Sequence, residues 1–75
     1  MKDLLNYLAS SLVDNPESVK IEEREEERTI YYTLQVDEKD MGKIIGKQGK
    51  NAQAIRTLMK AAGAKTDKRI IVDII

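Results

Sequence analysis

Three of the four glycines in this chain of 75 residues lie in one short stretch, Gly42-Lys43-Ile44-Ile45-Gly46-Lys47-Gln48-Gly49-Lys50, with three lysines among them. The sequence on both sides predicts helix, so this stretch is interpreted as a short polar turn between two helices. Gly46 and Gly49 permit backbone angles that other residues avoid, and they leave the backbone open to a ligand. The second helix begins near Lys50, where unpaired N–H groups and the positive end of the helix dipole favour an anion such as phosphate. Lys47 and Lys50 add positive charge at the same place.

The first half of the chain predicts one helix followed by two strands. Apolar residues recur at helical spacing over residues 4–13, with Asp3 as the expected N-cap. Pro16 ends this helix, because the residue before a proline avoids helical angles. Residues 18–22 alternate between polar and apolar side chains and predict a short strand, and the charged run after them leads into a hairpin turn. Residues 29–36 predict a second strand, whose expected inner face is Ile30, Tyr32, Leu34 and Val36.

The second half predicts two helices and a last strand. Asp37 is expected to cap a helix over residues 38–45, with Asp40 as a short-armed version of the capping box. A longer helix follows over about residues 50–62, with Gly63 as the glycine that ends it. Gly42 is expected at a position of close packing. Residues 69–75 predict the last strand.

This order, α-β-β-α-α-β, indicates a single domain of the α+β class over residues 1–75. Three strands and three helices pack most economically as a three-stranded sheet that the three helices cover on one face. No internal repeat or linker divides the chain.

The formal net charge is zero, but the two halves of the chain differ strongly. Residues 1–38 hold four basic and ten acidic side chains, a net of −6. Residues 39–69 hold nine basic and two acidic side chains, a net of +7. Such asymmetry favours a polyanion site in the second half. A solvated surface that carries both signs is the alternative interpretation of the charges alone.

Several classes of function are disfavoured by the composition. The chain has no cysteine and no histidine, so the commonest general base and the commonest metal ligands are missing. The phosphate loop of nucleotide hydrolases and the dinucleotide-binding glycine pattern are both absent. We therefore expect no enzyme, no catalytic residue, no metal site and no cofactor. No apolar run is long enough for a membrane span and the N-terminus does not resemble a signal peptide, so we expect no membrane contact and a cytoplasmic protein.

The run from Ile44 to Arg56, which reads IIGKQGKNAQAIR, resembles the signature of KH domains. These domains bind single-stranded nucleic acid and clamp its backbone with a G-x-x-G loop. With a helix and two strands before the loop, the whole chain resembles the single-domain bacterial KH proteins of the KhpA family and their type II topology. A bare G-x-x-G is a weak signal, but the preceding isoleucines, the following helix and the closing strand make this resemblance specific. Ala52 departs from the family pattern, in which a larger aliphatic residue is common at that position.

The resemblance implies single-stranded RNA binding, in a bacterial RNA chaperone or post-transcriptional regulator. RNA phosphates would be held at the Gly46-Lys47-Gln48-Gly49 loop and bases would lie in an adjacent aliphatic groove. One of the two isoleucines would line that groove while the other packs inward. The RNA-binding residues implied are Lys43, Ile44, Ile45, Gly46, Lys47, Gln48, Gly49, Lys50 and Arg56.

An alternative function is a protein-interaction module that acts through dimerisation. A small chain has a thin margin of stability, and association with another chain is one source of additional stability. Ile71 and Ile75 alternate with the inward-facing residues of the last strand and predict an apolar outer sheet surface there. The family resemblance implies either a homodimer or a heterodimer with a larger KH-domain RNA-binding protein of the KhpB type.

Overall fold

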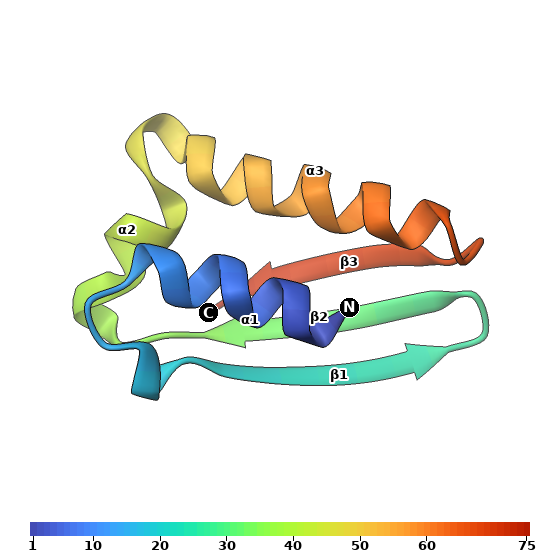
Figure 1. Ribbon diagram of the computed structural model, residues 1–75, viewed down its shortest axis with the longest axis horizontal. Coiled ribbons are helices and arrows are strands. Elements are labelled where there is room, and N and C mark those ends of the chain that lie inside the picture. Colours follow the sequence, from blue (N-terminus) through green and yellow to red (C-terminus); the bar gives the residue numbers. More distant parts are fainter.

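The computed structural model describes all residues 1–75 and contains three α-helices and three strands (Figure 1). Helix α1 spans Lys2–Leu12, and strands β1 and β2 span Lys20–Glu26 and Thr29–Gln35. Helices α2 and α3 span Met41–Ile45 and Lys50–Ala64, and strand β3 spans Arg69–Ile74. Three short 3₁₀ turns complete the chain: η1 (Pro16–Ser18), η2 (Glu38–Asp40) and η3 (Lys47–Gly49). The predicted order α-β-β-α-α-β and the α+β class are confirmed.

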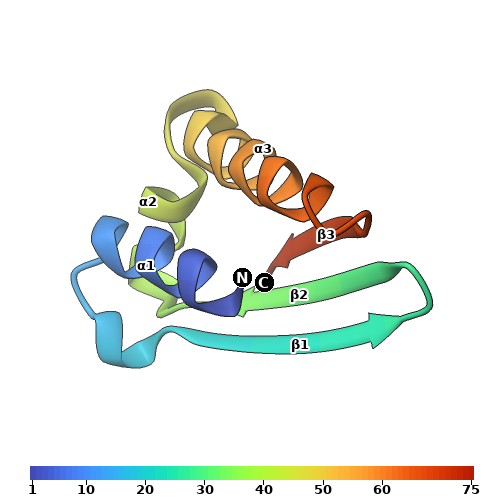
Figure 2. The same cartoon turned by 45° about the vertical axis from the view of Figure 1, so that its right-hand side comes forward.

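The sheet has the strand order β1-β2-β3. Strands β1 and β2 form an antiparallel hairpin with Ile21 opposite Leu34, and β2 and β3 run parallel with Ile30 opposite Ile70. All three helices lie on one face of this mixed sheet, as both views of the molecule show (Figure 2). The prediction of a sheet covered on one face is therefore confirmed.

The core lies between the sheet and the helices. Strand β2 contributes every second residue to it, because alternate side chains of a strand point to opposite faces. Burial of the Tyr32 ring and the nearby Glu23 carboxylate raise the pKa of the Tyr32 phenol. The eleven core residues are Leu5, Ala9, Ile30, Tyr32, Leu34, Val36, Ile44, Ile55, Met59, Ile70 and Val72.

Two predicted caps are wrong. Helix α1 begins at Lys2 with Met1 at the cap position, and no side chain caps it, so Asp3 lies inside the first turn. The Asp40 carboxylate does not form a capping box. It accepts hydrogen bonds from the backbone N–H groups of Asp14 (3.3 Å) and Asn15 (3.1 Å), which follow α1. Asp37 does act as a cap, since its carboxylate accepts a hydrogen bond of 2.9 Å from the N–H of Lys39 in η2.

The roles predicted for two glycines are also wrong. Gly63 does not end α3 but lies inside it, buried against β3, where a Cβ atom would come within 2.2 Å of Ile70 Cγ1. Gly42 is not closely packed, because a Cβ atom there would meet no atom within 4 Å. The close-packed glycine of this fold is therefore Gly63.

The outer sheet face is not the continuous apolar surface that the last strand predicted. Strand β1 contributes charged residues to it, and Arg24 lies over the Tyr31 ring at 4.7 Å from the ring centre. On β3, Ile71 is half-buried and lies between two exposed charged residues, Arg69 and Asp73. Ile75 is exposed at the end of the chain.

Candidate nucleic-acid interface

The glycine loop, Gly46-Lys47-Gln48-Gly49, joins the end of α2 to the start of α3. Gly46 has φ 75° and ψ 174°, a conformation that is essentially restricted to glycine. A Cβ atom at this position would also lie 2.6 Å from Asn51 Cγ. Position 46 therefore requires glycine both for its backbone angles and for the side chain packed against it.

The second half of the loop is left-handed. Gly49 has φ 75° and ψ 12°, and Gln48 adopts φ 57° and ψ 27° although it is not a glycine. The N–H of Gly46 donates to the Gly42 carbonyl at 2.8 Å, and the N–H of Gly49 donates to the Gly46 carbonyl at 3.1 Å. The side chains of Lys47 and Gln48 are exposed. The loop is thus a tight turn that presents backbone and two polar side chains to solvent.

The positive charge at the loop comes from three sources. Helix α3 begins at Lys50 and runs for 15 residues, so its positive dipole end lies against the loop. Lys47 and Lys50 are exposed, and neither belongs to any of the three ion pairs of the structure. The start of α3 and these two lysines give the glycine loop a positive local charge.

Lys43 is directed elsewhere. Its ammonium group forms an ion pair and hydrogen bond with the Asp14 carboxylate, in the turn after α1. The hydrogen bond to Asp14 raises the pKa of Lys43 and is the largest effect on it. Desolvation lowers this pKa by less than the hydrogen bond raises it, and the charges of Asp14 and Asp40 raise it further. Of the lysines predicted at the site, Lys43 is the one whose charge is already compensated.

The two isoleucines before the loop have different environments. Ile44 is fully buried in the core, whereas the Ile45 side chain is 41% exposed beside the loop. The sequence predicted that one of the pair packs inward and that the other lines the groove, and the structure shows that Ile44 is the one that packs inward. Ile45 is the apolar side chain that a ligand at the loop can reach.

Arg56 lies on α3, about 10 Å along the helix from Gly49 at a rise of 1.5 Å per residue. Its Nε donates a hydrogen bond of 3.2 Å to the Val72 carbonyl on β3, the strand at the edge of the sheet. Arg56 lines a hollow of about 310 Å³ between α3 and β3, which we call the edge groove. Its lining residues are Arg56, Lys60, Arg69, Ile70, Ile71, Val72 and Asp73.

The sequence did not predict Lys60 and Arg69 as part of the site. Lys60 follows Arg56 by four residues on the same helix, and this spacing puts both side chains on one helical face. Arg69 comes from the start of β3, and only the packing of α3 on β3 brings it to the groove. The edge groove therefore contains three cationic side chains and one acid, Asp73.

Asn51 was also missed as a site residue. Its Nδ2 donates a hydrogen bond of 2.9 Å to the Lys43 carbonyl, across the base of the glycine loop. An asparagine in the first turn of a helix usually forms a hydrogen bond to nearby backbone, and this tendency is the sequence signal that could have indicated a role for Asn51 at the loop.

An apolar cleft lies between α1 and α3, on the helical side of the molecule. We call it the helix cleft; its volume is about 320 Å³. Two large side chains beside it are exposed, Tyr7 at 70% and Leu58 at 49%. The lining residues are Tyr7, Leu8, Ser11, Leu12, Asn51, Ala54, Ile55 and Leu58.

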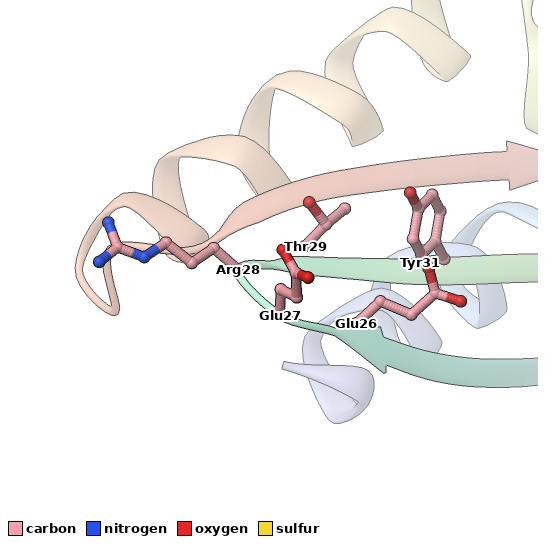
Figure 3. A pocket seen from close by; sticks show the side chains of 5 residues that line it. All are labelled: Glu26, Glu27, Arg28, Thr29 and Tyr31. Atoms are coloured by element: carbon pink, nitrogen blue, oxygen red, sulfur yellow. The ribbon is translucent and has the colours of Figure 1, made fainter.

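A further hollow lies at the tip of the β1–β2 hairpin (Figure 3), at the opposite end of the molecule from the glycine loop (Figure 1). Its five lining residues are Glu26, Glu27, Arg28, Thr29 and Tyr31, and the Arg28 side chain points away from the other four. Two acids and one base give this lining a net negative charge, which disfavours phosphate. No three acidic side chains gather into a potential metal site, and no helix has the length and apolar character needed to cross a membrane.

Comparison with known proteins gives a consistent result. The family model described as the KH domain of KhpA/KhpB matches residues 2–74. The chain is 52% identical over 75 residues to the RNA-binding protein KhpA of Caldanaerobacter subterraneus subsp. tengcongensis and to that of Clostridium acetobutylicum, and both chains are covered in full. It is 43% identical over 75 residues to the RNA-binding protein KhpA of Aquifex aeolicus, and this match covers all of the chain and 95% of that relative.

Proposed function

The chain belongs to the KhpA/KhpB family of KH domains, and from that membership we propose that it binds single-stranded RNA. RNA phosphates lie at the glycine loop, and the bases pass over Ile45 and enter the edge groove. The relatives are named as RNA-binding proteins, which supports RNA as the ligand. The activity that follows is that of an RNA chaperone or post-transcriptional regulator rather than an enzyme.

The conformation of the glycine loop is the observation that carries this proposal. Three of its four residues have positive φ, and the loop meets the start of a long helix with two unpaired lysines beside it. Backbone N–H groups at such a turn and at the start of a helix bind phosphate without reading its sequence.

The edge groove supports single-stranded rather than duplex ligands. Its volume of about 310 Å³ lies between one helix and the sheet edge, so a base must leave a duplex stack to enter it. No aromatic side chain lines the groove. Bases would therefore be held by aliphatic contact and by backbone groups of β3, and not by aromatic stacking.

Replacing Lys47 and Gln48 together by Asp tests the site. The two glycines and the turn remain, but one positive charge is lost and two negative charges appear where a phosphate lies. Like charges at about 4 Å repel by roughly 1–4 kcal/mol in a wet or partly exposed site. We expect at least about tenfold weaker binding to a fluorescent single-stranded RNA, because about 1.4 kcal/mol is a factor of ten.

Lys20→Asp with Gln35→Asp is the matched control. These exposed residues pair across β1 and β2 on the outer sheet face, and the charge change is the same. We expect binding close to that of the wild type, with thermal melts by circular dichroism to verify both folds. Wild-type affinity in a folded Lys47→Asp, Gln48→Asp protein would exclude the glycine loop as the RNA site.

We also propose that a second copy of the chain docks on the helix cleft. Its exposed Tyr7 and Leu58 are large apolar side chains on two adjacent helices, an arrangement typical of interaction surfaces. A formal net charge of zero means that no net charge opposes the approach of two copies, and no charged side chain lines the helix cleft. The interface is thus placed on the helices and not on the outer face of β3.

Analytical ultracentrifugation at micromolar concentration tests this second proposal. We expect a dimer for the wild type and for Ile75→Glu, whose side chain lies at the end of β3, and a monomer for Leu58→Glu. The wild type is also measured together with a larger KH protein of the KhpB type. A wild type that is monomeric alone but binds this protein would replace the homodimer by a heterodimer. A wild type that is monomeric in both samples would exclude dimerisation.

A further inference from the structure

Helix α2 has too few residues to fix the glycine loop by itself. It spans five residues, and isolated helices of that length are unstable in water. Its position depends on tertiary contacts: Ile44 lies in the core, and Asp40 just before the helix binds the backbone after α1. These contacts hold α2 against the core, but neither of them involves a residue of the glycine loop that follows it.

The loop conformation also requires support. Gly46, Gln48 and Gly49 all have positive φ, and Gln48 adopts it at a cost because it is not a glycine. The side chains of the loop supply nothing to offset this, since Lys47 and Gln48 are exposed and form no hydrogen bond or ion pair.

Asn51 connects the two ends of the loop. Its Nδ2 reaches back from the first turn of α3 to the carbonyl of Lys43, in the last turn of α2, where carbonyls lack helical partners. The same side chain packs against Gly46, so closely that a Cβ atom on residue 46 would lie 2.6–2.8 Å from three of its atoms. One side chain therefore contributes a hydrogen bond and a packing contact across the loop.

We propose that Asn51 is a positioning residue that holds the glycine loop in its RNA-binding conformation. This role rests on the proposed function, and it needs no contact between Asn51 and RNA. A loop that is held in place before binding loses less conformational freedom when the ligand binds, so RNA affinity depends on the contacts that Asn51 makes across the loop. When the binding conformation is only partly populated, the apparent dissociation constant rises in proportion.

The variant Asn51→Ala removes both contributions, and Asn51→Leu removes the hydrogen bond while it keeps a side chain of similar size against Gly46. Gln53→Ala is the matched control, because Gln53 is an exposed amide side chain on the same helix, away from the loop base. The first readout is amide hydrogen exchange of the glycine loop in the free protein. The second is the dissociation constant for single-stranded RNA.

We expect faster exchange at the glycine loop in both Asn51 variants, with β2 and β3 unchanged, and RNA binding weakened about fivefold to tenfold, the effect of one lost hydrogen bond. Gln53→Ala should match the wild type in both readouts. The oligomeric state is measured alongside, because Asn51 also lines the helix cleft.

Unchanged loop exchange in folded Asn51→Ala and Asn51→Leu proteins would overturn the proposal, as would a loosened loop with unchanged RNA affinity. A wild type that binds no RNA would overturn the proposed function and the RNA-binding role of Asn51 with it. In that case the exchange data would still show whether Asn51 braces the loop.

Discussion

Individual glycines in this domain are required for different physical reasons. Gly46 and Gly49 have positive φ in the loop, whereas Gly63 has no space for a side chain and Gly42 has open space around it. The helical pair Gly42 and Gly63 therefore gives a direct comparison of what an added methyl group does in a helix.

Gly63→Ala is expected to destabilise the fold and Gly42→Ala to stabilise it. At Gly63 the new Cβ would meet Ile70 Cγ1 at 2.2 Å and the Lys68 carbonyl oxygen at 3.1 Å, so β3 must shift. Overpacking of this kind costs roughly 1–3 kcal/mol. At Gly42, alanine gains up to about 1 kcal/mol of helix propensity without a clash. Urea denaturation measures both, and a Gly63→Ala protein as stable as the wild type would contradict the packing described here.

The same residues show what local sequence can predict at this scale. The glycine loop was predictable because its spacing and neighbouring lysines are local features. The close packing of Gly63 was not, because it arises from Ile70, which belongs to a different element. Likewise, the Lys43 charge was assigned to the ligand because its partner Asp14 is 29 residues away in the chain.

At the scale of elements, Asp40 connects α2 to the segment after α1. It is 2% exposed, and it accepts hydrogen bonds from three N–H donors: the backbone groups of Asp14 and Asn15 and the Asn15 side chain at 3.5 Å. The capping-box prediction failed because these partners lie 25 and 26 residues away, so no local pattern indicates them. Strands β2 and β3 were predicted well, since alternation and β-branched residues are local signals. Strand β1 was predicted over residues 18–22 but spans Lys20–Glu26, because its charged residues are held by pairing with β2 and carry no apolar alternation of their own.

Asp40→Ala should destabilise the domain by roughly 2–4 kcal/mol, because it leaves buried donors unsatisfied and removes a charged acceptor. Asp40→Asn keeps the shape and one acceptor oxygen, so it should cost less. Denaturation midpoints of the two variants give the comparison. Equal stability of Asp40→Ala and the wild type would mean that these hydrogen bonds do not anchor α2.

At the scale of the whole molecule, two clusters of like charge lie far apart. The hairpin tip with its glutamates and the glycine loop with its lysines lie at opposite ends (Figure 1). The sequence predicted this asymmetry from charge counts, but not which cations are free. Lys43 and Lys68 pair with Asp14 and Glu25, which leaves Lys47 and Lys50 at the loop and Arg56, Lys60 and Arg69 in the edge groove.

The five free cations of the glycine loop and the edge groove predict the response of RNA binding to salt. If three or four phosphates are neutralised, log affinity falls against log salt with a slope of roughly −2 to −3, from about −0.7 per phosphate on single strands. Lys60→Gln should reduce the steepness by about 0.7 if Lys60 contacts a phosphate. Lys20→Gln, on the outer sheet face, should leave the slope unchanged. Titrations from low to high salt measure all three proteins. An equal slope in Lys60→Gln and the wild type would show that Lys60 contacts no phosphate, and a slope near zero in the wild type would remove the basic half of the chain as the binding face.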